Sequence, residues 1–197
     1  MLKRAFDLLL SAFGLLLISP LLLVCGAWVL LDSRGPVFYS QDRVGRKGAI
    51  FKLIKFRSMK SGSDRSGLLT VGGRDARITR SGYYLRKYKL DELPQLFNVL
   101  MGDMSLVGPR PEVPKYVALY TPQQLEVLSL KPGITDWASL KYFDENELLG
   151  NAENPEQVYI EEIMPAKLSI NLEYVKNRSL LGDCEIILLT LLRIVKR

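Results

Sequence analysis

The chain has 197 residues, which is long enough for one domain with its own hydrophobic core. Its 27 Lys and Arg residues against 21 Asp and Glu residues give a net charge of +6, which favours an anionic partner such as a nucleotide or a phospholipid surface. The sequence contains no histidine, which excludes a Ser-His-Asp triad, a Cys-His pair and a histidine-ligated metal. Chemistry must therefore use Asp, Glu, Lys, Tyr or Cys. The two cysteines, Cys25 and Cys184, lie in apolar stretches and indicate small hydrophobic residues in a reducing compartment.

The first expected element is a membrane-embedded segment. Residues 8–31 carry no charge, and about 20 apolar residues suffice for a helix to span a bilayer. A cleaved signal peptide, a spanning helix and a re-entrant hairpin that enters and leaves on one side all compete. The signal peptide is disfavoured because Val24 precedes Cys25 where lipoprotein signals have a small residue, and because the apolar run continues beyond it.

Ser19 and Pro20 lie near the middle of this segment and predict an interruption of the helix. Proline removes an N–H donor and clashes with the preceding turn, while serine can bond a freed carbonyl. Basic residues flank both ends, with Lys3 and Arg4 before the segment and Arg34 after it. Because positive residues mark the cytoplasmic side, the charges favour a helix–break–helix that stays in one leaflet. A spanning helix with a tolerated proline remains the alternative.

The next expected element is a β-hairpin. Residues 37–39 and 51–57 are strand-like runs, and the glycine-rich residues 45–48 form the turn between them. Side chains alternate between the two faces of a strand, so Lys55 and Arg57 fall on the same face of the second run.

Two adjacent carboxylates, Asp91 and Glu92, follow a basic helical run at residues 76–89 and precede an apolar helix at residues 93–100. One interpretation is structural, since Asp is a good N-cap and Glu complements the helix dipole. The other is chemical, since cations and a helix N-terminus suit a phosphate. A carboxylate can hold Mg²⁺ against substrate phosphates or attack phosphorus itself. Phosphoryl transfer needs mainly positioning and charge neutralisation, and it does not need histidine.

Arg110 lies between Pro109 and Pro111. The two prolines fix the backbone and so orient one guanidinium, whose fork of donors suits a phosphate.

The C-terminal third predicts two helical stretches. Residues 158–177 are helix-like, with Pro165 marking a break. Residues 184–197 are apolar and end in cations, which is typical of an amphipathic helix lying at a membrane interface. A packed C-terminal core helix fits the same pattern equally well.

Four motifs occur in a characteristic order: KFRSM at residues 55–59, LDELPQLFNVL at 90–100, GDMSLVGPRP at 102–111 and KPGIT at 131–135. With the apolar segment that holds Ser19 and Pro20, they resemble the bacterial sugar transferases that act as monotopic phosphoglycosyl transferases. The resemblance covers nearly the whole chain. It implies an α+β, mostly helical monotopic membrane protein with a small β-hairpin or sheet and interfacial amphipathic helices. Residues 1–34 would form the re-entrant membrane helix, and residues 35–197 the cytosolic catalytic domain.

The resemblance also implies a reaction. Such enzymes move a sugar-1-phosphate from a UDP-sugar to undecaprenyl phosphate or another polyprenol phosphate, and they release UMP. This step initiates bacterial glycan synthesis at the inner membrane, with the catalytic domain facing the cytoplasm. The implied partners are the UDP-sugar, undecaprenyl phosphate and membrane lipid but no nucleic acid, and a homodimer is left open.

Carried over to this sequence, the resemblance makes Asp91 the nucleophile that forms a covalent phosphosugar intermediate. Glu92 would be its partner in holding Mg²⁺. Four basic residues become candidates to bind substrate phosphate: Arg86, Arg110, Lys55 and Arg57. The chain departs from the family pattern at Lys89, where many relatives have a small polar residue. The acidic residues 142–149 lie where sugar specificity is expected to be decided.

Two other functions compete with this enzyme. One is a basic, membrane-tethered protein that binds nucleic acid or anionic lipid without chemistry, although the specific features are carboxylates and fixed prolines and no nucleic-acid motif appears. The other is an inactive scaffold of a glycan assembly complex, against which the intact Asp91, Glu92 and Arg110 argue.

Overall fold

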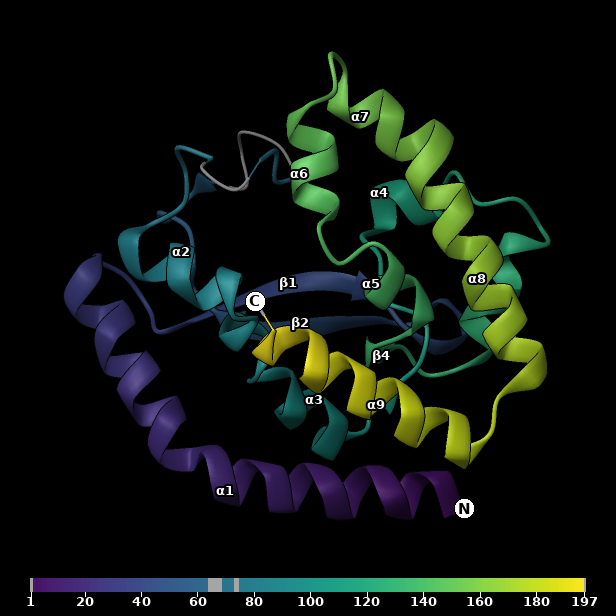
Figure 1. Cartoon of the computed structure of the whole chain (residues 1–197), viewed down its shortest axis with the longest axis horizontal. Helices are drawn as coiled ribbons and strands as arrows, with labels where there is room; N and C mark the ends of the chain where they lie inside the picture. Colours follow the sequence, from purple (N-terminus) through teal and green to yellow (C-terminus); the bar gives the residue numbers. More distant parts are fainter. Residues whose placement is uncertain (1, 64–68, 73–74, 197) are drawn as a thin grey trace.

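The computed structural model describes residues 2–63, 69–72 and 75–196. Within these residues, helices surround two small two-stranded sheets, and the long N-terminal helix lies along one edge of the molecule (Figure 1). This confirms the α+β, mostly helical expectation.

The strands are β1 (Phe38–Val44), β2 (Ile50–Phe56), β3 (Ser105–Val107) and β4 (Gly133–Thr135). The α-helices are α1 (Leu2–Asp32), α2 (Arg80–Lys87), α3 (Gln95–Met101), α4 (Pro114–Val117), α5 (Trp137–Lys141), α6 (Glu145–Gly150), α7 (Pro155–Val158), α8 (Met164–Asn177) and α9 (Leu180–Val195). Shorter turns are the 3₁₀ segments η1 (Arg46–Gly48), η3 (Leu90–Glu92) and η4 (Gln124–Ser129) and the π segment η5 (Tyr159–Ile163).

The predicted hairpin is confirmed. β1 and β2 pair antiparallel, with Phe38 opposite Phe56 and Val44 opposite Ile50, and η1 forms the connection. The second sheet is parallel, with β3 beside β4. It depends on glycine, because a Cβ added at Gly133 would come within 2.1 Å of the backbone nitrogen of Gly108.

α1 is one continuous helix that bends, rather than two helices separated by a break. Its assignment runs through Pro20, and Figure 1 shows its two halves at a clear angle to each other. Proline has no N–H, so the carbonyl four residues earlier loses its helical donor. For Pro20 this carbonyl is that of Leu16. The Ser19 hydroxyl donates to that carbonyl at 2.8 Å. Serine and proline therefore kink the helix without interrupting it, which corrects the helix–break–helix prediction.

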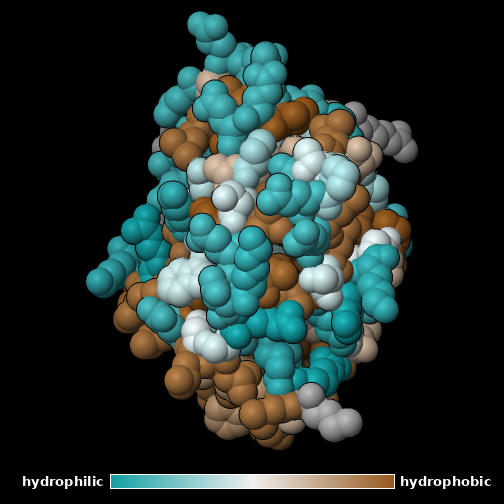
Figure 2. Space-filling model, turned by 90° about the vertical axis from the view of Figure 1, so that its right-hand side faces the viewer, coloured by the Kyte–Doolittle hydropathy of each residue, from teal (hydrophilic) through white to brown (hydrophobic). Residues whose placement is uncertain are grey.

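Most of α1 is not covered by the rest of the protein. Among the described residues it is the one helix long and apolar enough to cross a membrane, with 31 residues. Leu9, Leu16 and Leu31 are each more than 70% exposed. Apolar surface gathers along the lower edge of Figure 2, at the level where α1 lies in Figure 1.

Polar contacts attach the first turns of α1 to the body. Arg4 donates to the carbonyl oxygens of Val99 and Leu100 at the end of α3, at 2.6 and 3.0 Å. The buried Asp7 accepts hydrogen bonds from the Ser105 hydroxyl at 2.9 Å and the Leu106 backbone at 3.2 Å. These bonds hold an apolar helix against β3 and α3 although it buries few apolar side chains there.

α9 combines the two alternatives that its sequence left open. Ile186 is completely buried, so one side of the helix packs on the core. On the other side Leu181 and Val195 are more than 80% exposed, as in an amphipathic helix. One face of the helix therefore packs on the core, and the opposite face exposes apolar side chains.

Pro165 does not break its helix, contrary to the prediction. It is the second residue of α8, and the chain is helical from α7 through η5 into α8. The π segment η5 lies directly before it, and the wider hydrogen-bond pattern there accommodates a residue without an N–H donor.

Arg57 stabilises the end of α1. Its side chain is buried, and its guanidinium donates to the carbonyl oxygens of Pro36 at 2.7 Å, Ser33 at 2.8 Å and Arg34 at 3.0 Å. It also donates to the Ser33 hydroxyl at 2.7 Å. The guanidinium is thus engaged by the chain where α1 turns into β1, and this position does not leave it free for a phosphate.

We predict that Arg57→Lys lowers the free energy of unfolding by about 2 kcal/mol, because a lysine ammonium cannot reproduce a planar fork bonded to several acceptors. Thermal or denaturant unfolding of the purified protein in detergent measures the change. Arg46→Lys is the matched control, since Arg46 makes an exposed bond to the Ser129 carbonyl. Equal stability of the two variants would remove the capping role from Arg57.

Candidate active site

A cavity of about 920 Å³ opens between the β1–β2 hairpin, η3, the loop before α4 and the helices α5, α6, α8 and α9. The predicted catalytic and phosphate-binding residues all contribute to its wall: Lys55, Arg57, Arg86, Asp91, Glu92 and Arg110. Arg57 differs from the others, because its guanidinium donates to backbone carbonyl oxygens just after α1. The membrane residues Ser19 and Pro20 lie elsewhere, in the middle of α1.

Asp91 is buried as the middle residue of η3 and does not act as a helix cap. Lys89 precedes this turn with a left-handed backbone, φ 55°, which reverses the chain between α2 and η3. Among the described residues, no side chain caps η3 or α3, so the structural interpretation of Asp91 is wrong. Asp91 is 5% exposed, and its Oδ1 has no hydrogen-bond partner within the described chain. Burial, reinforced by the charge of Glu92, raises the pKa of the Asp91 carboxyl.

Three cations lie around Asp91 and oppose that rise in pKa: Arg86, Lys55 and Lys89. Lys55 comes from β2, Arg86 from the last turn of α2, and Lys89 from the reversal before η3. Burial, together with the charge of Arg43, lowers the pKa of Lys55 to about 8. Its ammonium also lies 5.4 Å from the centre of the Tyr39 ring.

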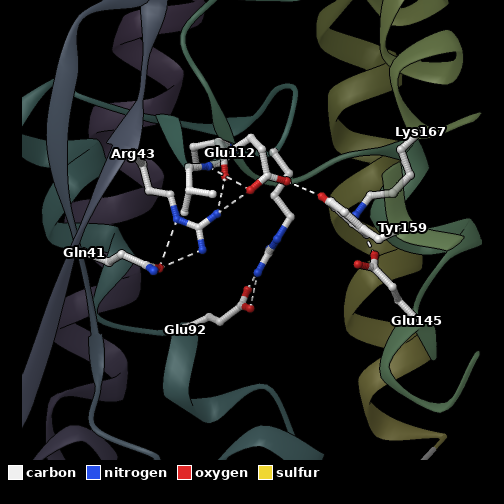
Figure 3. Close-up of polar contacts among 10 residues, drawn as sticks. Gln41, Arg43, Glu92, Glu112, Glu145, Tyr159 and Lys167 are labelled. Carbon is white, nitrogen blue, oxygen red and sulfur yellow. Dashed lines mark hydrogen bonds and ion pairs between the residues drawn. The ribbon is translucent and has the colours of Figure 1, made fainter. Parts of the chain in front are cut away.

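Glu92 has a different environment from its neighbour. Arg110 donates to both of its oxygens, from Nη1 at 3.1 Å and from Nη2 at 2.5 Å (Figure 3). Although burial opposes it, the charge of Arg110 lowers the pKa of Glu92. The backbone of Arg110 is itself held by Asp136 at 2.9 Å, so the pair is fixed from two sides. The predicted rigidity of Arg110 is therefore combined with a partner that the sequence did not indicate.

A polar network continues along the wall on the far side of Arg110. Arg43 donates to Gln41 at 2.8 Å and to Glu112 at 3.2 Å, and Tyr159 donates its hydroxyl to the other oxygen of Glu112 (Figure 3). Sequence reasoning missed this network. Two signals were available: Glu112 follows the Pro-Arg-Pro motif directly, and Arg43 shares a face of β1 with Gln41. Tyr159 lies too far along the chain for any local pattern to connect it.

The acidic residues 142–149 also reach the cavity. Glu145 forms an ion pair with Lys167 at 2.6 Å, and both side chains are mostly buried (Figure 3). Phe143 lies under the ammonium of Lys89 at 5.2 Å. The segment that sequence analysis left without a structural role is therefore part of the cavity wall.

The described residues contain no group of three or more carboxylate or cysteine side chains arranged to hold a metal. Mg²⁺ does not require such a group, because it is commonly bound by one or two carboxylates together with substrate phosphates and water. The unpartnered Oδ1 of Asp91 fits this mode of binding. Glu92 fits it less simply, because Arg110 already occupies both of its oxygens.

Fold and site together define a protein that combines an exposed apolar helix with a cavity of buried carboxylates and cations. The chain belongs to the bacterial sugar transferase family, whose sequence pattern it matches over residues 1–197.

Curated relatives carry the names of sugar phosphotransferases. The chain is 39% identical over 97% of its length to the undecaprenyl-phosphate glucose phosphotransferase of Komagataeibacter xylinus. It is 37% identical over 96% of its length to the UDP-N-acetylgalactosamine-undecaprenyl-phosphate N-acetylgalactosaminephosphotransferase of Aeromonas hydrophila. It is 35% identical over 95% of its length to the UDP-glucose:undecaprenyl-phosphate glucose-1-phosphate transferase of Caulobacter vibrioides. The aligned region spans 35% of the first relative, 42% of the second and 67% of the third.

Proposed function

We propose that this chain is a phosphoglycosyl transferase that moves a sugar-1-phosphate from a UDP-sugar to undecaprenyl phosphate and releases UMP. The observation that carries the proposal is Asp91, a buried carboxylate whose Oδ1 has no hydrogen-bond partner among the described residues. It lines a cavity whose wall contains several cations. Membership of the sugar transferase family and the names of the relatives support the same reaction. Such a step initiates the assembly of a bacterial glycan.

The proposed reaction has two halves. In the first, an oxygen of Asp91 attacks the phosphorus that bears the sugar, and the bond from this phosphorus to the bridging oxygen breaks. UMP leaves with that oxygen and its electron pair, and the sugar phosphate stays on Asp91 as an acyl phosphate. In the second half, a phosphate oxygen of undecaprenyl phosphate attacks the same phosphorus. The Asp91 oxygen then leaves as a free carboxylate, and the product is a sugar linked to the lipid through a diphosphate.

The basic residues would act by neutralising and positioning phosphate. Lys55, Arg86 and Lys89 lie around Asp91 and suit the diphosphate of the UDP-sugar. Arg110, held by Glu92, presents a fixed guanidinium to the same cavity. We assign Glu92 two roles, to orient Arg110 and to assist Asp91 in holding Mg²⁺. When bound, Mg²⁺ would neutralise phosphate charge.

We further propose that the protein is monotopic and lies in the bacterial inner membrane, with its catalytic part facing the cytoplasm. The bend of α1, its exposed leucines and the basic residues at both of its ends support a re-entrant helix. The apolar side of α9 would rest on the same membrane surface. A site at that surface reaches both a soluble nucleotide and a lipid phosphate.

The first prediction of this proposal concerns Asp91. With Mg²⁺ and a panel of UDP-sugars but no acceptor, the protein should release one UMP per chain for its own substrate and gain the mass of a sugar phosphate, measured on the intact protein. Asp91→Asn should lower UMP release by about a thousandfold, because an amide is a poor nucleophile.

Asp42→Asn is the control for that experiment, because Asp42 pairs with Lys52 on the exposed part of the hairpin and does not line the cavity. Full activity of Asp91→Asn would contradict the covalent role. Absence of UMP with every UDP-sugar, from folded protein in lipid, would favour the scaffold or the binding protein instead.

The second prediction concerns pH. Lys55 carries its charge below its pKa of about 8 and loses it above, so kcat/KM for the UDP-sugar should fall as the pH rises through about 8. On the acid side, kcat/KM should fall as Asp91 is protonated, at a pH above the usual carboxyl range because its pKa is raised. Lys55→Arg should move the alkaline limb upward, because arginine stays charged. An unmoved alkaline limb would exclude Lys55 as the titrating group.

The third prediction concerns topology. A tag on the N-terminus should be protected from protease in intact spheroplasts, since a re-entrant helix returns to the side it entered. Pro20→Leu should straighten α1 and expose the tag, because leucine restores the missing hydrogen bond. Leu21→Ala, one position further on, should leave the tag protected. Exposure of the tag in the unsubstituted protein would establish a spanning helix.

A further inference from the structure

The cavity that holds Asp91 extends into an apolar arm between the two exposed helices. α1 and α9 both pack against β3. α3, which lies between them in Figure 1, contributes Leu96 to the wall of the same cavity. Six apolar residues of these two helices line the arm: Leu10, Gly14 and Ile18 of α1, and Ile187, Leu191 and Ile194 of α9.

Helical spacing makes each set of three a continuous stripe. The α1 residues recur every fourth position, and the α9 residues follow at intervals of four and three, so each set lies along one face of its helix. The α1 stripe is only partly exposed at Gly14 and Ile18, whereas Phe13 and Leu17 on other faces are more than 60% exposed. α1 therefore presents one apolar face to the surroundings and another to the arm.

The arm is shaped by the core above it. Leu96, Leu106 and Ile134 line its inner surface and belong to the same hydrophobic cluster. Gly14 lies against this surface, since a Cβ there would be 3.8 Å from the Leu96 side chain. Near the start of both helices, Lys3 and Asp183 form an ion pair at 2.7 Å that joins α1 to α9.

The other end of the same cavity is polar. It contains Asp91 and the cations Lys55 and Arg86. A ligand that fills the whole cavity must therefore be apolar along one part and anionic at its tip. A lipid with a single chain that ends in a phosphate has this form, whereas a diacyl phospholipid would need room for a second chain.

We infer that the arm is the binding groove for the isoprenoid chain of the acceptor lipid, and that it directs the terminal phosphate toward Asp91. The inference rests on the proposed function and adds the site at which the acceptor is recognised. The first isoprene units lie between the stripes of α1 and α9, and the rest of a long chain continues into the bilayer. The groove thus selects for a chain as well as for a phosphate.

The test measures how strongly the enzyme prefers a long acceptor. The full chain is assayed in detergent for kcat/KM with undecaprenyl phosphate and with a phosphate of two isoprene units, at saturating UDP-sugar. Gly14→Leu fills the groove, and Leu191→Gln makes its wall polar at a residue that is 56% exposed and so costs little folding stability. Each should lower the ratio of the two kcat/KM values by about tenfold, the factor expected when contacts of about two methylene groups are lost.

Matched controls introduce the same changes outside the groove. Ala12→Leu adds a leucine on an exposed position of α1, and Leu192→Gln adds an amide next to Leu191, and neither residue lines the cavity. Both should keep the preference of the unsubstituted protein. If Gly14→Leu and Leu191→Gln also keep it, the groove binds no acceptor chain, while the proposed transfer reaction still stands. Failure of the unsubstituted protein to release UMP from any UDP-sugar would overturn the reaction and the groove together.

Discussion

The structure depends on polar contacts that fasten an apolar helix to a basic body. α1 buries few apolar side chains, so the hydrophobic effect alone does not fix its position. Arg4 and Asp7 hold its beginning. At its end, Arg57 donates to the carbonyl oxygens of Val29 and Ser33, and Asp32 accepts two hydrogen bonds from Ser81 at 2.8 Å. Such bonds are strong where water is excluded. They leave the opposite faces of the helix free for lipid and bring the start of α2, which leads to the active-site turn, against the end of α1.

Within the site, two neighbouring carboxylates acquire different properties because their surroundings differ. Asp91 is buried, one of its oxygens has no partner in the described part of the chain, and its pKa is raised. Arg110 donates hydrogen bonds to Glu92 and lowers the pKa of that carboxyl. Separation of the pKa values of two acidic groups is how active sites assign them separate tasks. The tight turn η3 makes this possible, because its consecutive residues have different neighbours: Arg86 lies near Asp91, whereas Arg110 donates hydrogen bonds to Glu92. The reversal at Lys89, with its positive φ, sets the direction of that turn.

Local sequence patterns predicted the elements that depend on residues close together in the sequence. The β1–β2 hairpin followed from alternation and glycine, and the apolar helix predicted at residues 93–100 corresponds to α3, which ends at Gly102 with φ 98°. The contacts that these patterns missed join residues far apart in the sequence. Arg57 looked like a free cation because the carbonyl oxygens that accept from it lie more than 20 residues away. Tyr159 carried no signal, because its partner Glu112 is 47 residues distant.

The bend in α1 shows why the sequence signal and the three-dimensional contacts are both needed. The dipeptide Ser19–Pro20 indicates that something happens in mid-helix, but a break and a kink have the same sequence signal. The hydroxyl of Ser19 decides between them by supplying the donor that Pro20 lacks, and the helix survives as one bent unit. A straight helix would run in one direction along its whole length. In the bent helix the first half lies below α3 and the second half runs beside α2 (Figure 1), so that one element forms both an exposed apolar surface and a wall of the cavity.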